Sequence, residues 1–369
     1  MKSSDIKNKR VERILLIRLR NIGDVLLTVP TFRAFREAFP RAFIAALVNA
    51  GTEEMLTGNP VLDEVLVFDR RWKELPLGQR VRREMEFVWQ VRRRGFDLVV
   101  NMTEGDRGAF LALASGAKDK IGLFTAHPGF WWKKRVFNHI VRIPDWKAHI
   151  VEQNLEIPRS LGIDPQDKRV DIFYSRRDEE KIRQLLGEEG IKPEDPLVHI
   201  HPTSRWLFKC WRDDGMARVI DGLQETGKVR VVLTSGGEKK ELTKIEQILH
   251  LCRTNPVSLA GKTTLKQLAA LSQRCKFFIG VDTAPMHIAA AVGKPVIALF
   301  GPSGEFNWGP WGNGHVVIKK DWECRPCGAD GCEGSKKSRC LEEISEEEVL
   351  QTAFQFLNRI EKSVVEDVS

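Results

Sequence analysis

The sequence predicts an α/β protein with two doubly wound, Rossmann-like domains that face a cleft. Two observations lead to this fold class. Short apolar segments alternate with amphipathic helices in both halves of the chain, a pattern typical of parallel sheets covered by helices on both faces. The chain has 369 residues, of which 42% are hydrophobic, so it exceeds one typical domain and can supply two cores.

The first half contains four short, largely apolar segments that we expect to be strands. They are residues 13–19, 43–48, 65–68 and 97–100. Helices are predicted over residues 24–39, where apolar side chains recur at helical spacing, and over residues 78–94, which are basic. Strands and helices in this alternation predict a first parallel sheet.

The pattern weakens between residues 164 and 196, where charged and proline-bearing stretches flank one charged helix. We place the domain border there, with a first domain at 1–175 and a second at 176–343. The second half repeats the alternation with five predicted strands: 197–201, 230–234, 257–259, 276–281 and 295–300. A last helix, 345–360, lies in a final segment, 344–369.

The formal net charge of +8 favours an acidic partner, which could be nucleic acid, an anionic membrane or a phosphorylated substrate. The sequence has no helix-turn-helix, RNP-type strand or zinc-finger spacing, so we expect no nucleic acid. NIGD after the first strand is not the GxGxxG of dinucleotide-dependent enzymes. The charged first ten residues are no secretory signal, and no run of about 18 apolar residues could span a bilayer, so a cytoplasmic location is predicted.

Polar residues follow several predicted strands, at the sheet edge where open parallel sheets bind ligands. Asp282, Thr283 and Ala284 start a helix that runs through His287, and the Thr283 hydroxyl with the first backbone N–H groups can hold an anion. The alternative is an ordinary helix cap. Asp24, after the first strand, is likewise either a general base or a cap.

Three segments carry a resemblance to a known family: RLRNIGDVLLTVP at 18–30, HPTSRWLFKCW at 201–211 and VDTAPMHIAAAVGKPVIALFGPSGEFNWGPW at 281–311. Together they resemble the bacterial lipopolysaccharide heptosyltransferases of glycosyltransferase family 9, which are inverting enzymes of GT-B fold that use ADP-heptose. PMH, FGPS and WGPW are most similar to the heptosyltransferase III branch.

The resemblance implies an acceptor-binding first domain, a nucleotide-sugar-binding second domain, and a last helix that crosses back to the first. It implies transfer of L-glycero-D-manno-heptose from ADP-heptose to the lipid A-core oligosaccharide, with a core heptose as acceptor. A GT-B transferase with another nucleotide sugar or acceptor, or heptosyltransferase I or II activity, is the alternative. An anionic inner-leaflet surface is then a further expected partner.

The resemblance also assigns roles to single residues. Asp24 matches the catalytic base, and Lys209 would offset negative charge on departing ADP. The expected ADP-sugar ligands are Gly23, Thr203, Ser204, Glu238, Asp282, Thr283, Ala284 and His287. Gly236 and Gly237 form a Gly-Gly turn after the predicted strand 230–234. Glu238, which follows this turn, is the acidic residue expected to bind the ribose, although Glu241 in the following KKE is another candidate. His287 is expected to bind rather than to act as a base.

Four cysteines lie in a Gly- and Lys-rich segment: Cys324, Cys327, Cys332 and Cys340. The CxxC pair is typical of thiolate zinc sites, but the second pair lacks that spacing. Structural zinc and reduced thiols therefore both stay open, and we expect catalysis to need no cofactor.

Basic and aromatic residues gather at 70–94 and 130–135. They are either solvated helix faces with buried tryptophans or a contact for a phosphorylated lipid acceptor. The second interpretation predicts peripheral attachment to the inner membrane that salt weakens.

Overall fold

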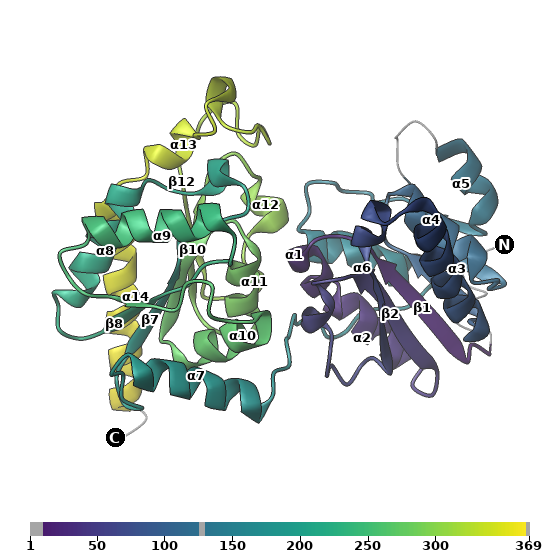
Figure 1. Ribbon diagram of the computed structural model, residues 1–369, viewed down its shortest axis with the longest axis horizontal. Coiled ribbons are helices and arrows are strands. Elements are labelled where there is room, and N and C mark those ends of the chain that lie inside the picture. The colour runs from purple at the N-terminus through teal and green to yellow at the C-terminus, as the bar shows by residue number, and fades with distance from the viewer. Residues whose placement is uncertain (1–9, 125–129, 367–369) are drawn as a thin grey trace. The chain divides into compact units, whose positions relative to one another are not determined.

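The computed structural model describes residues 10–124 and 130–366, without the side chains of 130–131 and 361–366. The chain forms two compact units, Met1–Phe173 and Tyr174–Ser369 (Figure 1). The border lies two residues before the one expected at 175/176. It falls inside the stretch where the strand and helix pattern weakens.

The first unit is built on a six-stranded parallel sheet in the order β3-β2-β1-β4-β5-β6. The strands are β1 (Arg13–Arg18), β2 (Phe43–Asn49), β3 (Glu64–Phe68), β4 (Leu98–Asn101), β5 (Asp119–Leu123) and β6 (His139–Val141). The four predicted strands are confirmed. Two were missed, because β5 begins with two charged residues and β6 has only three residues.

Helices of the first unit connect these strands. They are α1 (Ile22–Leu26), α2 (Val29–Ala38), α3 (Leu77–Arg93), α4 (Asp106–Ala114), α5 (Phe130–Val136) and α6 (Ile150–Ser160), with short 3₁₀ turns at Glu53–Met55 and Arg70–Glu74. The single helix expected at 24–39 is wrong. Pro30 lacks the N–H that would continue α1, so the chain breaks and restarts with Pro30 in the first turn of α2.

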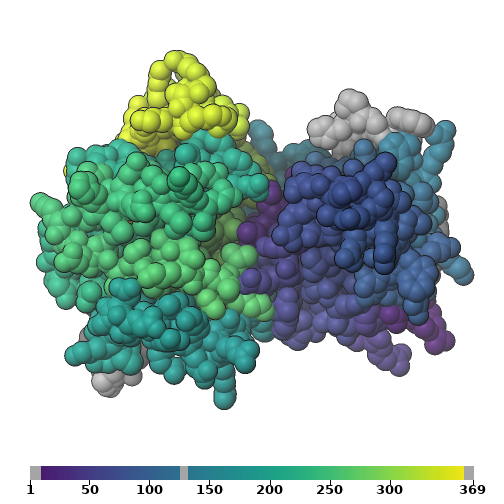
Figure 2. All heavy atoms as spheres, in the orientation of Figure 1, coloured from purple at the N-terminus to yellow at the C-terminus, as the bar shows by residue number. Residues whose placement is uncertain are grey.

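Helices cover both faces of the first sheet. Leu15 and Ile17 of β1 share a core with Phe87 of α3 and Ala109 of α4. Successive strand residues point to opposite faces, so the intervening Leu16 faces the other layer. In Figure 2, the blue spheres of α3 and α4 lie at the surface of this unit on the side toward the viewer.

The second unit repeats the plan with a parallel sheet in the order β12-β11-β10-β7-β8-β9. Its strands are β7 (Leu197–His201), β8 (Arg230–Leu233), β9 (Val257–Ser258), β10 (Phe277–Val281), β11 (Val296–Phe300) and β12 (Val316–Lys319). The five predicted strands are confirmed, and β12 was missed. The expected doubly wound α/β architecture is confirmed in each unit.

Helices of the second unit also form two layers. They are α7 (Arg176–Glu188), α8 (Asp213–Gln224), α9 (Lys239–Leu251), α10 (Leu265–Arg274), α11 (Ala284–Ala291), α12 (Glu305–Trp308), α13 (Arg339–Glu342) and α14 (Glu346–Glu366), with 3₁₀ turns η4 (Leu207–Lys209) and η5 (Cys332–Gly334). One face of the sheet packs with α8 and α14, and the other packs with α7 and α10.

The last helix is present as α14 and belongs to the second unit. It packs against α8, and its Val349, Ala353 and Phe356 are buried in the core of that unit. The Phe356 ring meets Phe277 of β10 edge to face, with ring centroids 5.6 Å apart. A crossing of residues 344–369 to the first unit stays a prediction.

Strand order fixes where each unit can bind a ligand. The chain leaves β1 toward β2 on one side, while β4 adds to the other side, so the order reverses between β1 and β4. The same reversal lies between β7 and β10 in the second unit. Loops diverge at such switch points and open a crevice at the carboxyl ends of the strands.

Candidate active-site residues

Asp24 lies at the switch point of the first unit, in the first turn of the short helix α1. The residue is 7% exposed, and its Oδ1 accepts a hydrogen bond from Nη2 of Arg18 at 3.1 Å. Nε of Arg20 lies 3.7 Å from the same oxygen. Asn21 occupies the cap position, so Asp24 is not the N-cap residue of α1. Gly23 directly precedes it in the helix.

Arg18 is held so that it can meet this carboxylate. The residue is 5% exposed, and its Nη1 donates to the carbonyl oxygen of Met102 at 2.5 Å, in the loop after β4. The backbone N–H of Leu19 donates to Oγ1 of Thr103 at 2.8 Å. Burial lowers the pKa of Arg18, and the charge of Asp24 opposes that effect. A carboxylate with two arginine partners is thus fixed at the edge of the first sheet.

In the second unit, two predicted residues from different loops meet as an ion pair. Lys209 lies in η4 after β7, and Asp282 follows β10. Nζ of Lys209 lies 2.5 Å from Oδ2 of Asp282, with the side chains 18% and 9% exposed. The ammonium also lies 5.2 Å from the centroid of the Trp206 ring. The pair places a cation over the switch point between β7 and β10.

Two acidic side chains, Glu238 and Glu241, follow the Gly-Gly turn after β8, and Glu241 contacts the turn. Glu238 is exposed, and its carboxylate lies 3.3 Å from Nζ of Lys240. Glu241, in the first turn of α9, is 7% exposed; its Oε2 accepts from the Thr203 hydroxyl at 2.8 Å and from the Gly236 N–H at 3.2 Å. The role of Glu238 as a ribose ligand stays a prediction. The spacing of Glu241, three residues after the helix cap, was the available signal for its contacts.

Glycine is required at position 236 for this contact. A Cβ there would lie 2.7 Å from Oε1 of Glu241, closer than side chains tolerate. The turn therefore binds the Glu241 carboxylate directly against the backbone. Thr203, which is fully buried, is fixed at the other end of the same carboxylate.

Two buried histidines of β7 continue this polar chain, and the sequence analysis had assigned neither of them a role. Oγ1 of Thr234 lies 2.7 Å from Nε2 of His199 and 2.8 Å from Nδ1 of His201, and Nδ1 of His199 lies 2.9 Å from Oγ of Ser272. Burial lowers the pKa of His201 to about 3 and the pKa of His199 well below its usual value. Both rings are neutral at pH 7, so they position Thr203 and Thr234 rather than supply charge.

The start of α11 presents the remaining predicted residues. Thr283 is the cap residue, but its side chain makes no cap hydrogen bond, and Ala284 begins the helix. Both are half-buried, whereas His287, in the second turn, is 4% exposed. Ser204 is buried too, and its Oγ accepts from the Trp206 N–H at 3.3 Å. The cap alternative therefore does not account for the hydroxyl of Thr283.

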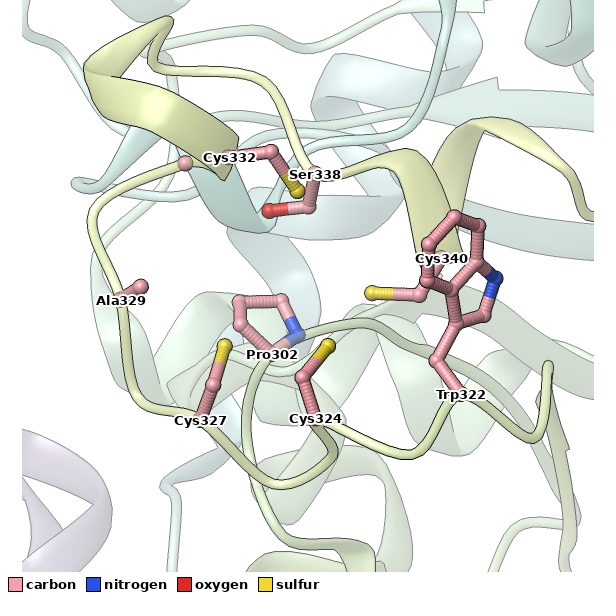
Figure 3. A pocket seen from close by; sticks show the side chains of 9 residues that line it. Pro302, Trp322, Cys324, Cys327, Ala329, Cys332, Ser338 and Cys340 are labelled. Carbon is pink, nitrogen blue, oxygen red and sulfur yellow. The ribbon is translucent and has the colours of Figure 1, made fainter.

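Four cysteines line one small pocket beside Pro302, Trp322 and Ser338 (Figure 3). The sulfurs of Cys324, Cys327 and Cys340 point into it (Figure 3). All seven cysteines are free thiols. Among residues 10–124 and 130–366, no group of three or more His, Cys, Asp or Glu is arranged to hold a metal ion. The residues as placed do not form a zinc site.

The basic and aromatic segments belong to the first unit. Residues 70–94 form a 3₁₀ turn and α3, and residues 130–135 lie in α5, where the side chains of the first two fall outside the described ones. Over the described part of the chain, each helix is too short or too polar to cross a bilayer.

Comparison with known proteins identifies relatives over most of the chain. Residues 85–337 match the family model "Glycosyltransferase family 9 (heptosyltransferase)". Lipopolysaccharide heptosyltransferase 3 of Escherichia coli K12 is 36% identical over 296 residues, which cover 79% of this chain and 83% of that protein.

Two solved structures share the fold. A family 9 glycosyl transferase from Veillonella parvula has a TM-score of 0.80 and 23% identity, with 94% of this chain and 97% of that one covered. E. coli heptosyltransferase WaaC, solved with ADP, has a TM-score of 0.72 and 20% identity, with 93% and 99% covered.

Proposed function

The chain belongs to glycosyltransferase family 9, the heptosyltransferases, and from this premise we propose its substrates. It transfers L-glycero-D-manno-heptose from ADP-heptose to a heptose of the lipopolysaccharide inner core. The name of the E. coli relative, heptosyltransferase 3, supports this acceptor. Related structures with ADP and with a fluorinated ADP-heptose support the donor.

The contact of Lys209 with Asp282 at the switch point of the second unit carries the proposal. A diphosphate needs cationic and N–H donors at one place, and this edge offers the Lys209 ammonium, the Thr283 hydroxyl and the first N–H groups of α11. Asp282 orients the ammonium. Lys209 then offsets the charge that grows on ADP as the bond to the sugar breaks.

The ribose of the nucleotide binds at the Gly-Gly turn. Glu241 holds Thr203 and the backbone of Gly236 in fixed positions, and its carboxylate can accept from ribose hydroxyls in the manner of dinucleotide folds. Glu238, Ser204, Ala284 and His287 remain proposed contacts of the nucleotide sugar. Glu238 is exposed, so it would contact the nucleotide sugar from the protein surface.

Asp24 is the base in a single in-line displacement. The acceptor hydroxyl oxygen forms a bond to the anomeric carbon while the bond from that carbon to the β-phosphate oxygen breaks. The proton goes to Asp24, and ADP leaves with the bonding electrons, so the anomeric configuration inverts. Arg18 and Arg20 fix the carboxylate, and no step in this scheme needs a metal or cofactor.

The acceptor places the enzyme at the cytoplasmic face of the inner membrane. A lipid A-core acceptor is anchored in a bilayer and carries phosphate, and the net charge of +8 suits an anionic surface. The attachment is peripheral and weakens with salt.

Transfer from ADP-heptose to defined truncated core oligosaccharides tests donor and acceptor together. We expect a heptose to be added only to acceptors that already carry the inner-core heptoses, at an unchanged rate after dialysis against a chelator. Transfer to a core without heptose would contradict the acceptor, and a preference for another nucleotide sugar would contradict the donor. Elemental analysis of the same protein decides whether the cysteine pocket holds zinc.

A further inference from the structure

The outer side of α3 carries exposed apolar side chains at four-residue spacing. They are Leu77, Val81, Met85 and Trp89, which are 51–75% exposed. Residues at this spacing lie above one another on one side of a helix. A surface helix normally turns polar residues away from the core, but here the core-facing side is already supplied by Phe87 and Val91. Packing within the first unit therefore does not explain the stripe.

The neighbouring helix widens this apolar surface. Phe110 and Leu113 of α4 are 51% and 52% exposed, and α4 packs against α3. Both helices lie at the surface of the first unit (Figures 1 and 2). We call the six exposed apolar residues of the two helices the α3–α4 face. Exposed apolar residues in such number on two helices that pack together mark a contact site rather than ordinary surface.

Arginines border the α3–α4 face. Helix α3 has five arginines and two glutamates, a net charge of +3. Arg82, Arg83, Arg92 and Arg93 are exposed. The guanidinium carbon of Arg93 lies 4.3 Å from the centroid of the Trp89 ring, so cation and aromatic ring are adjacent. An apolar side with Trp and Leu next to arginines is the composition of helices that lie in a membrane interface.

We propose that the α3–α4 face inserts into the surface of an anionic bilayer, with the apolar side chains among the acyl chains and the arginines at lipid phosphates. The inference rests on the proposed function, which brings the enzyme to a membrane-anchored acceptor, and it identifies the surface that makes the contact. A second copy of the chain is the other possible occupant. Charge argues against it, because two faces of net positive charge repel each other.

Vesicle flotation with a double variant tests the face. In Met85→Gln/Trp89→Gln, we expect binding to phosphatidylcholine vesicles containing phosphatidylglycerol to fall at least about tenfold, which equals about 1.4 kcal/mol. Trp146→Gln is the matched control, because Trp146 is 53% exposed in the same unit but lies outside the face. The control should bind within about twofold of the wild type, and circular dichroism should show equal folding of all three proteins.

A second double variant separates the contribution of the arginines to vesicle binding from the contribution of apolar insertion. Arg92→Gln/Arg93→Gln should lower binding to anionic vesicles and leave the weak binding to neutral ones unchanged. High salt should reduce wild-type binding without abolishing it, because ions screen the arginine contribution and not the apolar one. Complete loss of wild-type binding at high salt would contradict insertion.

Three further results would overturn the inference: unchanged vesicle binding of the double variant, an equal loss in Trp146→Gln, or a wild-type dimer that the double variant converts to a monomer. Assays of heptosyl transfer distinguish a failure of the membrane-face inference from a failure of the proposed function. Transfer to a core oligosaccharide freed of lipid should be equal in wild type and double variant, while transfer to a vesicle-embedded acceptor should fall. Face-dependent vesicle binding without transfer to either acceptor would refute the proposed function alone.

Discussion

Replacing Lys209 by Met should harm catalysis more than the loss of one lysine suggests, because it also releases Asp282. The ammonium lies 2.5 Å from the Asp282 carboxylate, and both side chains are less than one-fifth exposed. The variant loses a charge-assisted hydrogen bond to the diphosphate, about 1.5–3 kcal/mol. It also leaves a carboxylate near that anion, with repulsion of up to about 4 kcal/mol at an effective dielectric constant of about 20.

Partial solvent access reduces the sum, so we expect a loss of about 3–4 kcal/mol in the transition state, or about 150- to 1,000-fold in kcat/KM. Initial rates with ADP-heptose give this number, and calorimetry with ADP gives the ground-state loss. The calorimetric loss should be the smaller of the two, because negative charge on the diphosphate grows as ADP departs.

A second substitution tests whether repulsion by Asp282 contributes to the loss in Lys209→Met. Adding Asp282→Asn to Lys209→Met removes the repulsion, and the double variant should recover about tenfold in kcat/KM over Lys209→Met. Lys262→Met is the control: its ammonium lies 3.3 Å from Glu189 with the two side chains 49% and 38% exposed, so rates should not change. The reasoning fails if the double variant is no faster than Lys209→Met, or if Lys209→Met stays within about threefold of wild type.

Three other expectations follow from the described contacts. Asp24→Asn should abolish transfer while the protein stays folded and ADP affinity stays near wild type; its melting temperature should fall because buried Arg18 loses its charged partner, and near-normal turnover would remove Asp24 from the mechanism. Glu241→Gln should weaken ADP binding in calorimetry at least about tenfold more than Glu238→Gln, since only Glu241 binds Thr203 and the turn; equal effects would refute this assignment. Burial lowers the pKa of His201 to about 3, so the unfolded chain binds protons first and stability is lost as pH falls below about 6.5. Urea unfolding between pH 7 and 5 should lose about 2 kcal/mol less in His201→Gln than in wild type, and equal losses would contradict it.

Most of the strands that sequence patterns predicted have apolar runs that are buried on both faces, whereas β3 and β9 are only partly buried. β7, for example, was predicted with its observed bounds, and all five of its residues are buried. Of the four edge strands, β6 and β12 escaped prediction because few of their residues are buried, whereas β3 and β9 were predicted. β12 has one buried residue in four, and β6 has one in three. Their positions depend on pairing with a neighbour, which no local pattern records.

The candidate site was predictable as a set of loops and less so as a set of contacts. Strand ends indicated Asp24 and Asp282, since ligands bind at the carboxyl edge of a parallel sheet, whereas Lys209 was singled out by the family resemblance. The sequence pattern does not separate Glu238 from Glu241 as the ribose ligand, because both follow the same Gly-Gly turn. Only the fold shows that the first turn of α9 directs Glu241 back to Thr203 while Glu238 points to solvent.

Both switch points hold their charged side chains in ion pairs. Asp24 is paired with Arg18 and Arg20, and Lys209 is paired with Asp282. A diphosphate arriving at the second unit competes with Asp282 for the ammonium and must share it. Part of the binding energy is then used to loosen that pair in the ground state. The ammonium becomes most valuable when ADP departs and the charge on the diphosphate is largest, so the pair favours the transition state over the bound substrate.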